Sequence, residues 1–199
     1  MKQKIYIDFD STLFDVNKYL QNLYKICEKY NIKKDELDEI TNNIFKNHKA
    51  FFIDDLLKYL LEEKNVDKNI KRDFSLLEKK AFLFDDTLIF LKSIQTKYEP
   101  ILLTCGNIYH QQKKINACNI KEYFSDVIIV QENKSKVDNV DYQNGIFIDN
   151  NPLELEKFIS VNAKRVIRIK RNSDKYSKIN LTNSKLETYN TLKDVLKVL

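Results

Sequence analysis

The sequence predicts an α/β protein: a Rossmann-like parallel sheet with helices on both faces and an inserted all-helical segment. Three observations lead to this fold class. Short apolar runs, such as 100–104 and 165–169, are typical of strands buried on both faces. From residue 85 onward these runs alternate with segments of helical periodicity, as in parallel sheets with crossover helices. Before that point, four helical segments follow one another without an intervening strand.

The expected elements follow the chain in a simple order. A first strand ends at Asp8, and the apolar spacing then changes from a period of two to the helical period. Four consecutive helices are expected at 16–30, 34–46, 51–63 and 67–83. The alternating part is expected to contain helices at 87–97, 105–117, 151–160 and 191–199, a helical turn at 135–139, and strands at 100–104, 126–130, 145–149 and 165–169. This order predicts a core domain of 1–15 and 84–199 interrupted by a helical domain of 16–83.

The composition indicates a globular protein with a sizeable core. The chain has 199 residues, of which 43% are hydrophobic, enough for one domain carrying an insertion. No apolar run approaches the roughly 20 residues of a membrane helix, and the N-terminus does not resemble a leader peptide. Three scattered cysteines, Cys27, Cys105 and Cys118, are typical of reduced thiols. We therefore expect a cytoplasmic protein with no membrane partner.

The net charge of +5 is carried almost entirely by lysines spread along the chain. Such a distribution favours a solvated lysine-rich surface over a dedicated nucleic-acid interface, which would gather its charge in one patch or stripe. The sequence does not determine an oligomeric state.

Polar and charged side chains follow several of the predicted strands. Ligands of parallel sheets bind outside the carboxyl ends of the strands, so we expect these side chains to lie at one edge. They are Asp8 and Asp10 after the first strand, Thr104 at the end of the second, Lys134 or Lys136 after the third, and Asp149 with Asn150 after the fourth.

This set of residue types suits magnesium and a phosphoryl group. Carboxylates gathered in one place need a cation, and hard oxygen ligands favour Mg²⁺. A lysine and a threonine provide a point charge and a donor for phosphoryl oxygens. Backbone amides around Cys105 and Gly106, at a helix N-terminus, add a further anion site. The sequence thus predicts a phosphorylated small molecule as the substrate.

Four motifs in order resemble the haloacid dehalogenase (HAD) superfamily, chiefly its phosphatase branch. They are "DFDST" at 8–12, "ILLT" at 101–104, a lysine at 134 and "FIDNNP" at 147–152. The resemblance extends over the whole chain. It implies that the inserted helices at 16–83 form a helical cap.

The resemblance also implies roles for single residues. Asp8 is the implied nucleophile that forms an aspartyl-phosphate, and Asp10 the implied general acid and base. An acid at position 10 favours phosphoryl transfer over dehalogenation, because a leaving alkoxide needs a proton and a halide does not. The other implied roles are support of the turn by Thr12, phosphate binding by Thr104, Cys105, Gly106 and Lys134, and Mg²⁺ binding by Asp8, the backbone of Asp10, and Asp149, with Asn150 in support.

Two departures from the family pattern and an ambiguous lysine leave alternatives open. Ser11 replaces the usual glycine, and Asn150 stands where a second acid is common. Lys134 is preferred as the phosphate lysine because Ser135 is a plausible N-cap of the turn that follows, and Lys136 remains the alternative. The predicted function is Mg²⁺-dependent hydrolysis of a phosphate monoester. The open alternatives are a nucleotidase, a phosphotransferase or phosphomutase, and a catalytically silent binding protein.

Overall fold

The computed structural model describes residues 2–48, 53–172, 174–181 and 183–199. Its strands are β1 (Gln3–Ile7), β2 (Tyr98–Cys105), β3 (Asp126–Val130), β4 (Ile146–Asp149), β5 (Arg165–Ile169) and β6 (Leu186–Tyr189). Its helices are α1 (Val16–Lys29), α2 (Lys34–His48), α3 (Ile53–Glu62), α4 (Ile70–Glu78), α5 (Thr87–Ile94), α6 (Ile108–Cys118), α7 (Pro152–Ser160) and α8 (Leu192–Leu196), with short 3-10 helices η1 (Lys121–Tyr123) and η2 (Lys134–Lys136).

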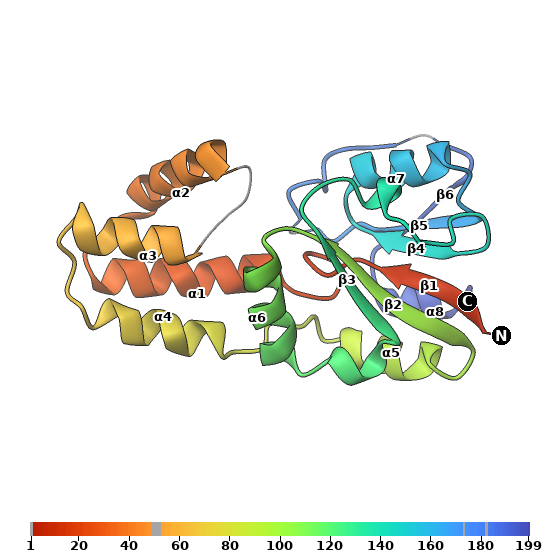
Figure 1. Ribbon diagram of the computed structural model, residues 1–199, viewed down its shortest axis with the longest axis horizontal. Helices are drawn as coiled ribbons and strands as arrows, with labels where there is room; N and C mark the ends of the chain where they lie inside the picture. Colours follow the sequence, from red (N-terminus) through yellow and green to blue (C-terminus); the bar gives the residue numbers. More distant parts are fainter. Residues whose placement is uncertain (1, 49–52, 173, 182) are drawn as a thin grey trace. The chain divides into compact units, whose positions relative to one another are not determined.

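The six strands form one parallel sheet in the order β3-β2-β1-β4-β5-β6 (Figure 1). The order reverses direction at β1: β2 and β3 lie on one side of it, and the chain then crosses from β3 to β4 on the other side. Crevices for ligands form at such a reversal, outside the carboxyl ends of the central strands. The predicted α/β class with a parallel sheet is confirmed.

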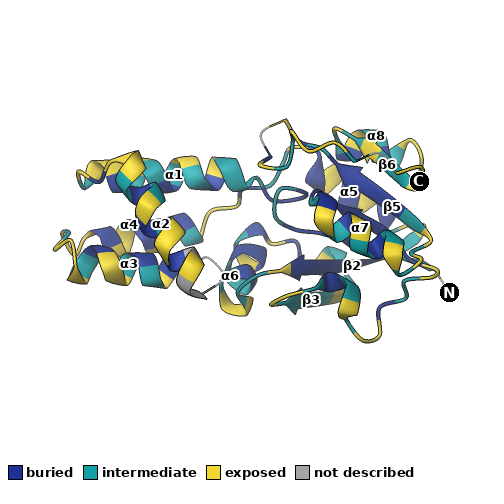
Figure 2. Ribbon diagram, turned by 90° about the horizontal axis from the view of Figure 1, so that it is seen from above, coloured by how far each residue is buried: buried dark blue, intermediate teal, exposed yellow. Residues whose placement is uncertain are grey.

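Helices cover both faces of the sheet. On one face, α7 packs on β4 and β5, and its residues Leu155 and Phe158 join a cluster with strand residues Tyr6, Ile101, Leu103, Phe147 and Val166. Side chains alternate along a strand, so the intervening strand residues point to the opposite face, where α5 and α8 pack together. Figure 2 shows β2 and β5 as largely buried, which explains why the strands read as apolar runs.

The described residues pack into two compact units. The sheet unit comprises those of Met1–Asp15, Leu83–Cys105 and Ile120–Leu199, and the helical unit comprises those of Val16–Phe82 and Gly106–Asn119. The helical unit thus contains the inserted helices together with α6, which packs on α4. A hydrogen bond of 3.0 Å from Lys113 of α6 to Glu78 of α4 links them. The division into a core and a cap domain stays a prediction.

The helical unit is built from amphipathic segments. In α1 the buried residues Tyr19, Leu23 and Cys27 recur every four positions, which places them on one face. The helix predicted at 67–83 is shorter than expected, because α4 ends at Glu78 and Leu83 pairs with Phe14 in an isolated bridge. Residues 51 and 52 of the helix predicted at 51–63 lie outside the described ranges.

The strand β6 was not expected from the sequence. Its four residues, Leu186–Tyr189, are mostly half-buried because β6 lies at the edge of the sheet. A short edge strand lacks the continuous apolar run that identifies a central strand. None of the helices in the described ranges is both long enough and apolar enough to cross a bilayer.

Gly145 is required by close packing just before β4. A Cβ atom there would lie 2.5 Å from the carbonyl oxygen of Asp141 and 2.7 Å from the ring of Tyr6. Because one of these neighbours is backbone, we expect Gly145→Ala to destabilise the protein by about 1–3 kcal/mol. The melting temperature should fall by about 2–12 °C for a chain of this size. Thermal unfolding followed by circular dichroism tests this, and an unchanged melting temperature would contradict it.

Candidate active site

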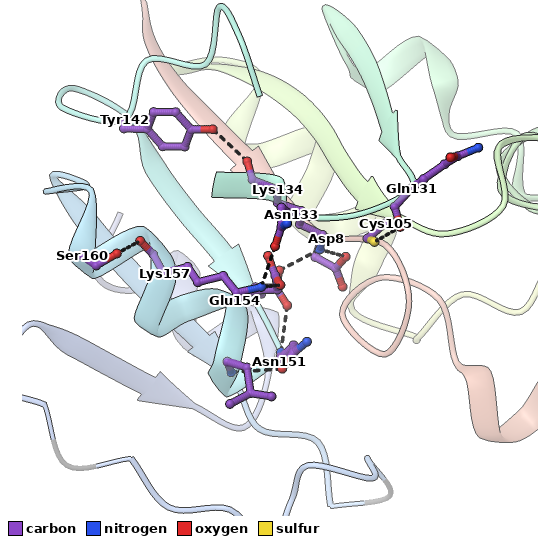
Figure 3. Close-up of polar contacts among 12 residues, drawn as sticks. Asp8, Cys105, Gln131, Asn133, Lys134, Tyr142, Asn151, Glu154, Lys157 and Ser160 are labelled. Atoms are coloured by element: carbon purple, nitrogen blue, oxygen red, sulfur yellow. Dashed lines mark hydrogen bonds and ion pairs between the residues drawn. The ribbon is translucent and has the colours of Figure 1, made fainter. Parts of the chain in front are cut away.

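Two buried carboxylates share one ammonium at the carboxyl edge of the sheet. Nζ of Lys134 donates hydrogen bonds to Oδ1 of Asp8 and, at 2.8 Å, to Oδ2 of Asp149. The three residues are only 5%, 3% and 1% exposed, in the order Asp8, Lys134 and Asp149. Figure 3 shows Asp8 and Lys134 meeting at this point. These contacts join Lys134 to Asp8, which lies 126 positions earlier in the sequence, and to Asp149, which lies 15 positions later.

The strand order explains this meeting. Asp8 directly follows β1, Asp149 ends β4, and these strands are neighbours in parallel register. Lys134 begins η2, which follows β3 and packs on β2. The hydroxyl of Tyr142 donates to the backbone carbonyl of Lys134 at 2.8 Å and so fixes η2 (Figure 3).

Burial and the charges of the neighbouring groups shift the pKa values of all three residues. Burial raises the pKa of Asp8 to about 7, helped by the charge of Asp149 and opposed by Lys134. Burial also raises the pKa of Asp149, against the opposing effect of Lys134. Burial alone would lower the pKa of Lys134, but the two carboxylates outweigh it and the net shift is upward. The site therefore favours additional positive charge.

The turn after β1 holds Asp8 from its other side. Oγ1 of Thr12 is buried and donates to Oδ2 of Asp8 at 3.2 Å, as expected for a residue that supports the turn. Ser11 adopts a left-handed conformation with φ of 60°, a conformation that glycine adopts without strain. Asp10 is half-buried, and its charge contributes to the raised pKa of Asp8.

Thr104 and Cys105 end β2, the other neighbour of β1. The Thr104 hydroxyl is fully buried and has no hydrogen-bond partner within the described part of the chain. Cys105 is exposed, and its Sγ donates to the carbonyl of Gln131 at 3.2 Å. Although the residue as a whole is exposed, partial burial of its sulfur raises the pKa of the thiol, which disfavours the thiolate form.

Gly106 packs with the helical unit. Its φ of +151° favours glycine, and a Cβ there would lie 2.9 Å from Nε2 of Gln111. The helix α6 that follows is capped by Asn107, whose side chain accepts from the backbone N–H of His110 at 2.8 Å.

The geometry favours Lys134 over Lys136 as the lysine of the site, because Lys136 is exposed. The reason given from the sequence was wrong, however. Ser135 does not cap the turn but lies inside η2, and Asn133 takes the N-cap position in a left-handed conformation with φ of 53°. Asparagine tolerates this conformation better than most other non-glycine residues, and its side chain makes no capping hydrogen bond here.

Asn150 is engaged away from the Lys134 trio. Its Nδ2 donates to Oδ2 of Asp174 at 2.8 Å, and both side chains are buried. The backbone N–H of Asn151 instead donates to Oδ1 of Asp149 at 2.8 Å, and the Asn151 side chain caps α7. Asn150, which the resemblance placed in support of the metal site, thus has a defined partner elsewhere.

Glu154 is a candidate site residue that the sequence analysis missed. It lies in the first turn of α7, its side chain is 12% exposed, and Oε1 accepts from Lys157 at 2.6 Å (Figure 3). Oε2 is buried without a hydrogen-bond partner among the described residues. The charge of Glu154 raises the pKa values of both Asp149 and Cys105. The available signal was an acid five positions after Asp149, in the first turn of the helix that follows the strand.

The side chains at this site include oxygen donors of the kind that Mg²⁺ prefers. Within the described ranges, no group of three or more His, Cys, Asp or Glu side chains is arranged to hold a metal ion. The chemistry nevertheless fits, because Asp8 and Asp149 present hard oxygen donors and Glu154 has an unpartnered buried carboxylate oxygen. An ion of charge +2 would offset the excess negative charge of these groups.

Comparison with solved structures identifies related folds. A haloacid dehalogenase-like hydrolase from Burkholderia xenovorans matches with a TM-score of 0.79 and 15% identity, over 99% of this chain and 96% of that chain. A HAD phosphatase from Thermococcus onnurineus has a TM-score of 0.67 and 19% identity, with coverage of 100% and 97%. The HAD-hydrolase YfnB from Bacillus subtilis, bound to magnesium, has a TM-score of 0.67 and 13% identity, with coverage of 99% and 98%.

Haloacid dehalogenases match as well. One from Xanthobacter autotrophicus, with chloropropionic acid covalently bound, has a TM-score of 0.66 and 13% identity, over 100% of this chain and 98% of that chain. No protein-family model and no curated protein sequence matches the chain. The likeness extends over the whole length of these proteins, and the expectation drawn from the four motifs is confirmed at the level of the fold. The chain has the fold of the haloacid dehalogenase-like hydrolases.

Proposed function

We propose that this protein is a Mg²⁺-dependent phosphohydrolase that cleaves a small-molecule phosphate monoester through an aspartyl-phosphate. The observation that carries the proposal is the trio of Asp8, Lys134 and Asp149, gathered at the carboxyl ends of neighbouring strands. The magnesium bound to YfnB and the phosphatase from Thermococcus onnurineus, both of the same fold, add support.

In the proposed first step, a carboxylate oxygen of Asp8 attacks phosphorus. An oxygen–phosphorus bond forms on Asp8 while the bond from phosphorus to the alcohol oxygen breaks, and Asp10 gives its proton to that oxygen. In the second step, Asp10 takes a proton from water, the water oxygen attacks phosphorus, and inorganic phosphate leaves Asp8 as a free carboxylate. Asp10 ends protonated, ready for the next cycle.

Two side chains of the site suit the phosphoryl group. The buried hydroxyl of Thr104 lacks a partner among the described residues and can donate to a phosphoryl oxygen. The ammonium of Lys134 stays charged, because its pKa is raised, and can stabilise negative charge that develops on the same oxygens. Preorganised donors of this kind need no rearrangement during the reaction.

The residues that would hold Mg²⁺ are Asp8, Asp149 and the backbone carbonyl of Asp10, with Glu154 as an additional acid. The bound ion would act as a Lewis acid that polarises the phosphoryl group. Asn150 is not needed for this set, since its amide is paired with Asp174. The asparagine at position 150 was the feature that favoured a catalytically silent protein. Because Asn150 is not part of the proposed metal set, its presence does not argue against catalysis.

The related dehalogenases make hydrolysis of a carbon–halogen bond the competing activity. An acid at position 10, close enough to affect the pKa of Asp8, favours phosphoryl transfer because an alkoxide leaving group needs a proton. The decisive experiment is release of inorganic phosphate from an aryl phosphate and from a panel of phosphorylated metabolites. We expect turnover with Mg²⁺ and none with EDTA. Halide release from a 2-haloacid without phosphate release would overturn the proposal.

The same assay distinguishes hydrolysis from transfer. A phosphotransferase or phosphomutase would pass the phosphoryl group to a second alcohol, so the phosphorylated acceptor would accumulate in place of inorganic phosphate. Adding glycerol or a sugar as acceptor and measuring both products makes this distinction.

Glu154 provides a sharper test of the metal site. We expect Glu154→Gln to raise the Mg²⁺ concentration for half-maximal activity by about 10–100-fold, while kcat at saturating Mg²⁺ changes little. The physical reason is the loss of one negative charge beside Asp149. The matched control is Glu156→Gln, which removes an exposed acid from the same helix. An equal Mg²⁺ dependence in the two variants would show that Glu154 takes no part.

A further inference from the structure

The end of β5 and the chain that follows it carry buried charges that the proposed mechanism does not use. Arg168, Arg171 and Asp174 are only 2%, 9% and 4% exposed. Charged side chains are almost never buried to this extent unless they are paired. Their hydrogen-bond partners therefore show which segments of the sheet unit these residues hold in place.

Arg171 is connected to the turn that carries Asp8 and Asp10. Its Nη1 and Nη2 donate to the two carboxylate oxygens of Asp86 at 2.9 and 2.8 Å, a bidentate pair. Nη2 also donates to the backbone carbonyl of Thr12 at 3.2 Å. The hydroxyl of the same Thr12 donates to Asp8. Arg171 is thus linked to the nucleophile through one residue.

Asp86 anchors this arrangement to the rest of the sheet unit. Its Oδ2 also accepts from the backbone N–H of Leu192, the first residue of α8, at 2.9 Å. The guanidinium carbon of Arg171 lies 4.0 Å from the centroid of the Phe84 ring. Arg171 is therefore held from two sides and has little freedom to move away from Thr12.

Asp174 is connected to the other catalytic loop. Its Oδ2 accepts from Nδ2 of Asn150, the residue directly after Asp149, at 2.8 Å. Its Oδ1 accepts from the backbone N–H of Tyr176 at 3.2 Å. An amide at position 150 is the fitting partner of a buried carboxylate, whereas a second acid there would face Asp174 with like charge.

Arg168 fixes the segment that carries both residues. It lies on β5 beside Asp149 in the parallel register, and its guanidinium donates to the carbonyls of Ile179 and Tyr176 at 2.6 and 2.7 Å. The chain around Asp174 is therefore tied to the same sheet edge as the candidate site.

We propose that Arg171 and Asp174 are positioning residues that brace the two loops bearing Asp8 and Asp149. This inference rests on the proposed function, and it explains the asparagine at position 150 as the partner of Asp174. Neither residue touches the reacting atoms. Each fixes a catalytic loop through a neighbour of a catalytic carboxylate, Thr12 in one case and Asn150 in the other.

An exchange of partners tests the Asp174 contact. In Asn150→Asp two buried carboxylates face each other, and we expect kcat to fall by about 10–100-fold with little change in KM. The double variant Asn150→Asp with Asp174→Asn restores one amide and one carboxylate. The amide introduced at position 174 can donate through Nδ2 and still accept from Tyr176 through Oδ1, so we expect most of kcat to return. Double-variant activity no higher than that of Asn150→Asp would overturn this part of the proposal.

A comparison of two arginines tests the Arg171 contact. Arg171→Met removes the bidentate pair with Asp86 and the hydrogen bond to Thr12. Arg165→Met removes the bidentate pair with Glu187 at the amino end of β5, away from the candidate site at the carboxyl ends of the strands. We expect the first to lower kcat by about 10–100-fold and the second to leave it unchanged. Equal kcat values at a temperature where both variants are folded would overturn this part.

Amide hydrogen exchange provides a readout that does not depend on activity. Without metal, Arg171→Met should speed exchange in residues 9–14, and Asn150→Asp should speed it in residues 149–152, with reversal in the double variant. Unchanged exchange in these segments would overturn the bracing role. If the wild-type protein releases no phosphate from any substrate, the proposed function fails, while the exchange pattern still decides whether the loops are braced.

Discussion

Replacing Asp8 with asparagine should abolish phosphate release. We expect kcat to fall by about 10⁴-fold or more, as when nucleophiles are removed from other covalent enzymes. An asparagine at position 8 cannot form the aspartyl-phosphate. It has a similar size, its Oδ1 can still accept from Lys134, and its Nδ2 can donate to the hydroxyl of Thr12, which donates to Asp8 in the wild type. The measurement is single-turnover release of inorganic phosphate with saturating Mg²⁺.

The matched control for this substitution is Asp138→Asn, which neutralises an exposed aspartate in the same sheet unit. It should retain wild-type activity. Mass spectrometry should also confirm that position 8 has not reverted to aspartate by deamidation. Turnover by pure Asp8→Asn within tenfold of wild type would exclude Asp8 as the nucleophile and with it the proposed mechanism.

Replacing Lys134 with glutamine should cause the largest loss of stability. The substitution leaves Asp8 and Asp149 buried without their shared cation. Removing one partner of a buried ion pair costs about 3–5 kcal/mol. In EDTA at pH 8, the melting temperature should fall by about 6–20 °C for a chain of this size. Lys136→Gln, at an exposed lysine two residues away, should change it little.

The loss of stability in Lys134→Gln should increase as the pH rises. Asp8 has a folded-state pKa of about 7, raised from 3.8, so the folded protein binds a proton between these values that the unfolded chain does not. Stability therefore falls as pH rises through this window. Without the ammonium the pKa values of Asp8 and Asp149 rise further, and the difference between Lys134→Gln and wild type should grow from pH 4 to pH 8. A constant difference would contradict this account.

Much of the fold could be predicted because its signals are local. The apolar runs at 100–104 and 165–169 are strands because both of their faces are covered, and the alternation with helices required a parallel sheet. The rule that ligands gather at the carboxyl ends of such strands then placed Asp8, Lys134 and Asp149 together.

Contacts between distant side chains could not be predicted in the same way. The resemblance placed Asn150 in support of the metal site, yet its amide donates to Asp174, 24 positions later. The sequence assigned no role to Arg171, yet this residue is buried against Asp86, 85 positions earlier. Neither the period of the apolar residues nor the spacing of the motifs indicates such pairs.

The sequence by itself determined the parallel α/β sheet and the residue types at its carboxyl edge. The period of the apolar residues and the ends of the strands can both be recognised from residues that are close in the sequence. Only the tertiary structure decided which charges neutralise one another. Burial makes a carboxylate or an ammonium costly until it finds a partner, and that partner is set by the packing of the sheet. The pairing of Lys134 with two acids, and of Asp174 with Asn150, follows from that cost.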